Sequence, residues 1–232
     1  MASSPFAALA DAFAKCRDLD APLAERLDLY SNAVRQHIPE YADAVDALVD
    51  RLTRSGAGVS APGPGEVMPP FVLPDEAGRM TSLDQLLRNG PLAITFHRGH
   101  WCPWCRISAR ALAKVQGEIA GAGGRVAAIM PELQSFAAEF RSNAGLPFPV
   151  LTDVDNGYAL SLNLAIWLGP EIAQLLSYLD LSDFHGNALR MLPIPATFVV
   201  RPDGRIGARF VDPDFRHRMA VEELLAALAA AR

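Results

Sequence analysis

The sequence predicts an α/β protein in which a central mixed β-sheet is flanked by helices, with a helical extension at the N-terminus. Three patterns predict this architecture. From residue 71 onward, apolar runs typical of buried strands alternate with amphipathic helical segments, as expected for a sheet covered on both faces. A Pro-Asp-Gly turn at 202–204 joins two strand-like segments into an antiparallel hairpin, which makes the sheet mixed. Before residue 56, apolar residues recur only at helical spacing.

Length and composition restrict the class of protein. The 232 residues fit one domain of ordinary to large size, and 50% of them are hydrophobic, so a packed core is expected. The net charge of -5, without a block of Lys and Arg, gives no reason to expect nucleic acid or an anionic membrane surface as a partner. No apolar run approaches the roughly 18 residues of a membrane span. The Ala-rich start carries Asp11 and lacks a basic region, so we expect no targeting peptide and a cytoplasmic protein.

Residues 1–55 are predicted to form a helical extension with three apolar stripes. Each stripe needs a partner surface, which the main domain or a second subunit can supply, so a homodimer is one candidate assembly. Cys16 lies on the first stripe, where we expect it to pack as a small hydrophobe. The stripes are Phe6, Leu9, Phe13 and Cys16; Leu23, Leu27, Tyr30 and Val34; and Tyr41, Val45, Leu48 and Leu52.

Residues 56–70 are rich in Gly and Pro and are predicted to be a linker or an extended segment between the helices and a main domain at 71–232. Within that domain, Ser82 and Gln85 predict a capping box for a brief helix. Pro131 is expected to open a helix. Strands are expected at 71–73, 92–96, 125–130, 148–151, 196–200 and 205–211, and further helices at 102–120, across most of 157–180 with a break at 169–170, and at 221–231.

The pair Cys102 and Cys105 is the main chemical signal. It follows a buried strand and begins a helix, whose N-terminal amides and dipole stabilise a thiolate and lower its pKa. Pro103 fits the first helical turn, where a missing amide proton costs nothing. One helical turn brings the two sulfurs close enough to form a disulfide. The pattern therefore predicts thiol redox chemistry.

Within this pair we expect Cys102 to be the more exposed sulfur and hence the nucleophile, with Cys105 as the resolving thiol. Positive charge near the sulfurs would support the thiolate. Since side chains alternate along a strand, the two nearby histidines need not both reach a sulfur. The candidate cationic groups are His97, Arg98, His100 and Arg106.

Two other interpretations of the pair remain open. His97 and His100 together with the two cysteines contain zinc-ligand types, but structural zinc sites usually join two knuckles and no second Cys pair exists. The cysteines can also be inert core residues. We expect redox chemistry, with no metal and no other cofactor.

The second informative segment is 193–200, which begins Pro-Ile-Pro-Ala-Thr. Pro195 opens a core strand although proline cannot donate to the ladder. A cis peptide that turns backbone polar groups toward a site is the preferred explanation. An ordinary trans proline at the end of a loop is the alternative.

These segments resemble the thioredoxin superfamily and, more narrowly, the peroxiredoxin-like proteins of the alkyl hydroperoxide reductase and thiol-specific antioxidant (AhpC/TSA) group. The run Phe-x-Arg-Gly-x-Trp-Cys-Pro-x-Cys is matched by 96–105, and Pro-x-Pro-Ala-Thr-Phe-Val by 193–199. A late Val-Asp-x-Asp-aromatic-x-x-Arg run is matched by 211–218. The resemblance covers about residues 65–232.

The resemblance implies a thioredoxin-like fold and reduction of hydroperoxides through a sulfenic acid on Cys102. Cys105 would then condense with that acid, and a thioredoxin- or glutaredoxin-type donor would restore both thiols. The matched motifs also carry supporting candidates, which are Arg98, Trp101, Pro103, Pro195 and Thr197, with His100 and Arg218 as further candidates.

Two positions depart from typical peroxiredoxins. A Thr or Ser usually stands three residues before the reactive Cys, where this chain has Gly99, and an Arg usually precedes the final core strand, where it has Pro195. Arg98 or Arg218 can substitute as the anion-stabilising group, although Arg218 can equally form a surface ion pair with Asp214. The alternatives to a thiol peroxidase are therefore a thiol-disulfide oxidoreductase that acts on protein disulfides, and a non-enzymatic or metal-binding module.

Overall fold

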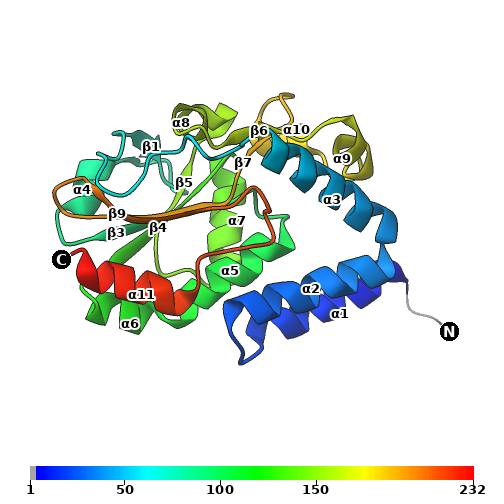
Figure 1. The fold of residues 1–232 in the computed structure, drawn as a ribbon, viewed down its shortest axis with the longest axis horizontal. Helices are drawn as coiled ribbons and strands as arrows, with labels where there is room; N and C mark the ends of the chain where they lie inside the picture. The colour runs from blue at the N-terminus through cyan, green and yellow to red at the C-terminus, as the bar shows by residue number, and fades with distance from the viewer. Residues whose placement is uncertain (1–3) are drawn as a thin grey trace.

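The computed structural model describes residues 4–232, and a five-stranded mixed sheet lies at its centre (Figure 1). The strand order is β5-β4-β3-β8-β9. β3, β4 and β5 are parallel, whereas β8 runs antiparallel to both β3 and β9. The predicted mixed sheet is thus confirmed. The strands are β3 Leu92–Phe96, β4 Arg125–Met130, β5 Val150–Thr152, β8 Ala196–Val200 and β9 Ile206–Val211.

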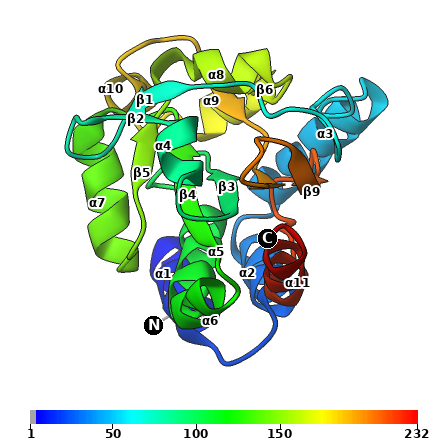
Figure 2. The same ribbon diagram turned by 90° about the vertical axis from the view of Figure 1, so that its left-hand side faces the viewer.

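Alternation along the central strands sends side chains into two separate cores. In β3, Ala93 packs on one side of the sheet, and its neighbours Leu92 and Ile94 pack on the other. The first side is covered by α5, α6, α7 and α11, and the second by α4 and α8 (Figure 2). These helices are α4 Leu83–Leu87, α5 Pro103–Lys114, α6 Gln116–Gly121, α7 Gln134–Ala144, α8 Gly157–Ser161 and α11 Val221–Ala230.

The three predicted N-terminal helices are present as α1 Pro5–Asp18, α2 Leu23–His37 and α3 Pro39–Arg54. α1 and α2 lie side by side and both pack on α5 (Figure 1). Their buried residues, Cys16 among them, belong to the same core as the Cys102–Cys105 pair. Most of the apolar stripes are therefore covered by their own chain, although Phe6 of the first stripe is 65% exposed, and Cys16 packs as expected. No helix in residues 4–232 has both the length and the apolar composition that crossing a membrane requires.

The 56–70 segment is ordered along the hairpin. The amide of Gly65 donates to Ile206 O at 2.8 Å, and that of Met68 to Gly204 O at 2.9 Å. Met68 is fully buried in the second core. Residues 56–61 form turns, and the chain is extended along the hairpin only from Gly65 onward, while the division of the chain into domains at this segment stays a prediction.

Several predicted elements differ from the structure. The helix expected at 102–120 is divided at Val115, whose backbone is not helical, and Gly117 follows in the second piece. The helix expected at Pro131 begins only at Gln134. The stretch 157–180 contains a short strand. The elements that the sequence pattern did not predict are β2 Met80–Ser82, which pairs with β1 Val72–Pro74; β6 Ala165–Trp167, which pairs with β7 Met191–Pro193; and α10 Leu181–His185, beyond α9 Pro170–Leu175.

The expected cis peptide at Pro195 is wrong, since no peptide bond within residues 4–232 is cis. Pro193 pairs with Ala165 in the β6–β7 ribbon, and the amide of Ile194 donates to Leu164 O at 2.8 Å. The chain therefore runs in an extended conformation from β7 into β8, with Pro195 between the two strands. In contrast, the predicted capping box at Ser82 is confirmed.

Truncation of one leucine in α2 tests whether the extension is part of the main core. Leu27 is 1% exposed in α2 and Leu29 is 40% exposed in the same helix. We expect Leu27→Ala to lower the free energy of unfolding by about 2–5 kcal/mol, because it removes buried methyl groups and leaves a cavity. Leu29→Ala is the control and should change it by less than about 0.5 kcal/mol. Urea unfolding measures both, and equal effects of the two substitutions would contradict this packing.

Candidate active site

The Cys-x-x-Cys motif lies where the predicted strand-to-helix junction places it. Cys102 is the N-cap of α5, and Pro103 is the first helical residue. Both Cys102 and Cys105 are 0% exposed. The expectation that Cys102 is the more accessible sulfur is therefore wrong, because neighbouring side chains cover the start of the helix. Both cysteines are free thiols in this structure.

Cys105 is surrounded by groups that stabilise a negative charge. The backbone N–H of Arg98 donates to its Sγ at 3.3 Å, and Nη2 of Arg218 lies 3.6 Å from the same sulfur. Burial alone would raise the pKa of this thiol. The neighbouring Cys102 thiol and His97 imidazole, together with the positive charge of Arg218, instead hold the pKa of Cys105 well below its usual value.

Cys102 has the opposite electrostatics. Burial, and the negative charge and hydrogen bond of Cys105, raise the pKa of Cys102 well above its usual value, although Arg98 and Arg218 oppose that shift. The two shifts favour Cys105 over Cys102 as the sulfur that loses its proton first. The helix N-terminus does not by itself make Cys102 the anion.

His97 and Thr197 line a small cavity beside the sulfurs. Thr95 Oγ1 lies 3.0 Å from Nε2 of His97 and holds the imidazole in place. His97, Thr197 and Arg218 face a cavity of about 20 Å³, which is room for about one water-sized molecule. The arrangement places a polar space next to the cation that contacts Cys105.

Arg98 is 2% exposed, and its guanidinium lies between aromatic rings. Its Cζ is 3.8 Å from the ring centroid of Phe215 and 5.2 Å from that of Trp101. Nη1 and Nη2 of Arg98 form no hydrogen bond with the residues described here, and neither does the buried indole nitrogen of Trp101. Cation–π contacts thus hold a largely unpaired charge near Cys102.

His100 is engaged by Glu132 and contacts aromatic rings. Its Nδ1 lies 2.9 Å from Glu132 Oε1, its backbone N–H donates to Oε2 at 2.8 Å, and its ring stacks on Phe136. A side chain at Gly99 would meet Trp101 Nε1 at 2.4 Å and Glu132 Oε1 at 2.7 Å. Glycine is therefore required where typical peroxiredoxins carry Thr or Ser. The contacts indicate that His100 positions the loop before Cys102.

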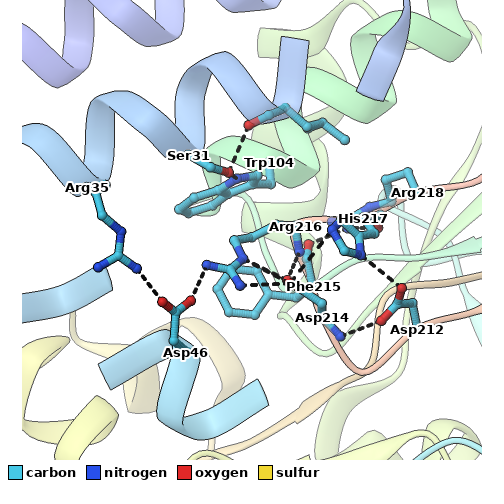
Figure 3. Close-up of polar contacts among 11 residues, drawn as sticks. Ser31, Arg35, Asp46, Trp104, Asp212, Asp214, Phe215, Arg216, His217 and Arg218 are labelled. Atoms are coloured by element: carbon cyan, nitrogen blue, oxygen red, sulfur yellow. Dashed lines mark hydrogen bonds and ion pairs between the residues drawn. The ribbon is translucent and has the colours of Figure 1, made fainter. Parts of the chain in front are cut away.

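The loop that carries Arg218 is fixed by a chain of ion pairs (Figure 3). Nε of Arg216 donates to Asp214 Oδ1 at 2.8 Å, and Nη1 donates to Asp46 Oδ1 of α3 at 2.7 Å. Arg35 of α2 also pairs with Asp46. The suggested Asp214–Arg218 ion pair is not formed, because Asp214 bonds Arg216. Although burial opposes it, these hydrogen bonds lower the pKa of Asp214.

Trp104 connects the same loop to α2. Its Nε1–H donates to Ser31 Oγ at 2.9 Å (Figure 3). Its ring makes edge contacts with Tyr30 and Phe215 at centroid distances of 5.0 and 5.3 Å. The ring of Phe215 in turn packs against the guanidinium of Arg98. The N-terminal helices, the Cys-x-x-Cys helix and the C-terminal loop thus meet at one aromatic cluster.

Pro195 is buried beside this region, but its neighbours Ala196 and Thr197, rather than Pro195 itself, line the small cavity. Burial raises the pKa of Cys16, as expected for a packed thiol. Within residues 4–232, no group of three or more His, Cys, Asp or Glu side chains is arranged to hold a metal ion.

Sequence reasoning missed two contributors to the site. Glu132 follows β4, which is parallel to β3. Because the carboxyl ends of parallel strands meet at one edge of a sheet, the sequence could have predicted that Glu132 lies near the end of β3. Asp46 carries no local signal, because it reaches the site only through the packing of α3 against the C-terminal loop.

The fold is shared with solved peroxiredoxin structures. Peroxidoxin BcpB from Mycobacterium tuberculosis aligns with a TM-score of 0.58 at 21% identity, over 73% of this chain and 98% of that protein. The bacterioferritin comigratory protein of Xanthomonas campestris aligns with a TM-score of 0.53 at 16% identity, over 73% and 96%. Similarity at this level supports the fold alone, and it confirms the predicted thioredoxin-like architecture.

Sequence comparison extends the similarity to the family. The putative peroxiredoxins MT2597 and Rv2521 of Mycobacterium tuberculosis are each 29% identical to this chain over 143 residues, which span 62% of this chain and 81% of theirs. The model of the AhpC/TSA family matches residues 64–209, more than half of the chain and including both cysteines of the motif. The chain is thus a peroxiredoxin-like protein that belongs to the AhpC/TSA family.

Proposed function

We propose that this protein reduces hydroperoxides with the Cys102–Cys105 pair and ends each cycle as an internal disulfide. The observation that carries the proposal is a buried sulfur, Cys105, which contacts the backbone N–H of Arg98 and the guanidinium of Arg218 and lies one helical turn from a second buried thiol, Cys102. These contacts favour the thiolate, which is the nucleophilic form of cysteine.

Each proposed reaction cycle oxidises two thiols to one disulfide and reduces one peroxide. A thiolate attacks the distal peroxide oxygen and breaks the O–O bond, and the leaving alkoxide takes a proton to become an alcohol, or water from hydrogen peroxide. The resulting sulfenic acid condenses with the second thiol, which releases water and forms the disulfide. Two sulfurs are oxidised as one peroxide is reduced. Arg218 next to the reacting sulfur can stabilise the charge that develops on the leaving oxygen.

The roles of the two sulfurs need a direct test. The peroxidatic role that the resemblance gives to Cys102 stays a prediction. The donors around Cys105 support the reverse order, in which the Cys105 thiolate attacks and Cys102 resolves. In that order the residue three positions before the reactive sulfur is Cys102, whose S–H donates as the hydroxyl of the usual Thr or Ser can.

The electron donor and the assembly belong to the same proposal. An external dithiol of the thioredoxin or glutaredoxin type would attack the disulfide and restore both thiols. Such a cycle requires a reducing compartment, in agreement with the predicted cytoplasmic location. Because both cysteines and the groups that contact them come from one chain, the cycle itself does not require the candidate homodimer.

Thiol-disulfide exchange with protein substrates is the alternative enzyme activity, and it shares the Cys-x-x-Cys motif. Both sulfurs are 0% exposed, which favours a small peroxide over a folded protein disulfide as the oxidant. Reduction of insulin disulfides at a rate above that with hydrogen peroxide would reverse this preference. A non-enzymatic role that does not use the cysteines would be unchanged in Cys102→Ser.

Separate substitution of the two cysteines identifies the attacking sulfur. We expect Cys102→Ser to keep the fast first reaction with hydrogen peroxide and to accumulate a sulfenic acid on Cys105 that dimedone traps. Cys105→Ser should lose that fast phase, because the stabilised thiolate is gone. Stopped-flow tryptophan fluorescence and mass spectrometry of the dimedone adduct provide the measurements, with Cys16→Ser as the control.

A fast phase that survives in Cys105→Ser but not in Cys102→Ser would restore the order predicted from the sequence. If neither single variant nor the unmodified protein reacts faster than a free thiol, peroxide reduction by this pair is ruled out.

Removal of the Arg218 charge tests the electrostatic part of the proposal. We expect Arg218→Met to raise the pKa of the Cys105 thiol, because the charge next to its Sγ is lost. The rate of alkylation by iodoacetamide should then reach its midpoint at higher pH. Arg201→Met, at an exposed position in the β8–β9 turn, is the matched control and should leave the midpoint unchanged. A midpoint unaffected by Arg218→Met would show that Arg218 does not stabilise the thiolate.

A further inference from the structure

Arg98 holds a buried guanidinium beside the redox motif. The side chain is 2% exposed, and neither Nη1 nor Nη2 has a hydrogen-bond partner within residues 4–232. Its Cζ lies 3.8 Å from the ring centroid of Phe215 and 5.2 Å from that of Trp101. Ring faces attract a cation but give its N–H groups no strong acceptor. A buried cation of this kind costs free energy, and a negative charge that forms nearby during a reaction would recover part of that cost.

The turn before α5 brings Cys102 back towards Arg98. The backbone N–H of Cys102 donates to Gly99 O at 3.2 Å, which closes the turn directly after Arg98. Burial and the neighbouring Cys105 raise the pKa of Cys102, and of the two arginines that oppose this rise Arg98 has the larger effect. At Cys105 the main positive charge is instead Arg218, whose Nη2 lies 3.6 Å from the sulfur. The two arginines therefore act mainly on different sulfurs.

Two tyrosines and two further arginines also lie close enough to interact electrostatically with Cys102. They are Tyr30 of α2, Tyr41 of α3, Arg106 of α5 and Arg218 of the C-terminal loop. Burial raises the pKa of both tyrosines, so they are neutral at physiological pH. Arg106 packs against Phe13 at 4.4 Å, Arg218 donates to two backbone carbonyls of its own loop, and neither side chain is fully buried. Arg98 is therefore the cation that a negative charge on Cys102 would stabilise most.

Reaction with peroxide changes the charge that Cys102 faces. In the reduced pair, a thiolate at Cys105 is a neighbouring negative charge that keeps Cys102 protonated. Once Cys105 has become a sulfenic acid, that negative charge is gone, while the positive charge of Arg98 remains. The balance at Cys102 then moves towards the thiolate, the form that can attack the sulfenic acid.

We propose that Arg98 activates Cys102 for the second step, closure of the disulfide, whereas Arg218 serves the first step at Cys105. The inference rests on the proposed function and on the order in which Cys105 attacks the peroxide. The Cys102 thiolate attacks the sulfenic sulfur of Cys105, the S–S bond forms and the S–O bond breaks. The hydroxide that leaves takes up the proton that Cys102 released and becomes water. Each step thus has its own buried cation.

Thiolate absorbance at 240 nm tests the charge effect without any peroxide. Cys105→Ser puts a neutral hydroxyl in place of the neutral sulfenic acid, and Cys16→Ser removes the remaining thiol, so that Cys102 alone titrates. In this full-length background we expect Arg98→Met to raise the midpoint of the thiolate signal by about one pH unit or more. Arg98→Lys, which keeps the charge, and Arg201→Met, at an exposed turn, should leave it nearly unchanged. A midpoint that Arg98→Met does not move would overturn the inference.

Rapid mixing of the reduced protein with hydrogen peroxide separates the two steps, because only the first phase depends on the peroxide concentration. We expect Arg98→Met to slow the second phase by about threefold to tenfold at pH 7, since fewer Cys102 thiolates are present although each is a stronger nucleophile. The first phase should stay nearly constant, because the backbone N–H of residue 98 that contacts Cys105 is retained. Arg98→Lys should restore the second phase.

The same traces distinguish failure of the inference from failure of the proposed function. A first phase that Arg98→Met slows, with the second unchanged, would place Arg98 at the attacking step and reject the inference while peroxide reduction stands. Equal slowing of the second phase in Arg98→Met and Arg98→Lys would show a packing role instead of a charge effect and also reject it. No fast first phase in the unmodified protein would reject the proposed function, and the inference with it.

Discussion

The proposed reaction depends on a negative charge on Cys105, whose side chain is 0% exposed. An uncompensated thiolate is costly at a buried position, so the protein must supply the stabilising groups itself. It does so with the backbone N–H of Arg98, the guanidinium of Arg218 and the thiol of Cys102. The first comes from the chain that follows β3, and the last is at the N-cap of α5. The sheet therefore brings the acceptor and its local donors together.

Arg218 is the one of these three donors that lies far from Cys105 in the sequence. Contacts with other parts of the molecule therefore fix its position. The ion pairs of Arg216 connect its loop to Asp46 of α3, and Trp104 connects the same region to Ser31 of α2 (Figure 3). Single surface ion pairs contribute little to the free energy of unfolding, but this set fixes the orientation of a short loop. The N-terminal helices thus do more than cover apolar surface. They supply Asp46 and Ser31, which bond to Arg216 and Trp104, and they line a pocket at the start of α5.

Local patterns predicted the parts of this protein that local forces determine. Periodicity predicted the strand at 92–96. The residues typical of helix ends predicted the capping box at Ser82 and the position of the Cys-x-x-Cys pair at the start of α5. The lowered pKa of Cys105 rather than Cys102 could not be predicted, because Arg218 lies 113 residues from Cys105 in the chain. The trans geometry at Pro195 depends on the β6–β7 ribbon, whose three-residue strands are too short to leave a pattern.

Thiol counting during oxidation tests the central claim most directly. The reduced protein is treated with increasing amounts of hydrogen peroxide, and the remaining thiols are counted under denaturing conditions while the mass of the protein is measured. A buried thiolate with a resolving partner predicts that one equivalent of peroxide removes two thiols, leaves Cys16 free and lowers the mass by two hydrogens. Loss of one thiol with the gain of oxygen atoms, or no loss at equimolar peroxide, would contradict the account.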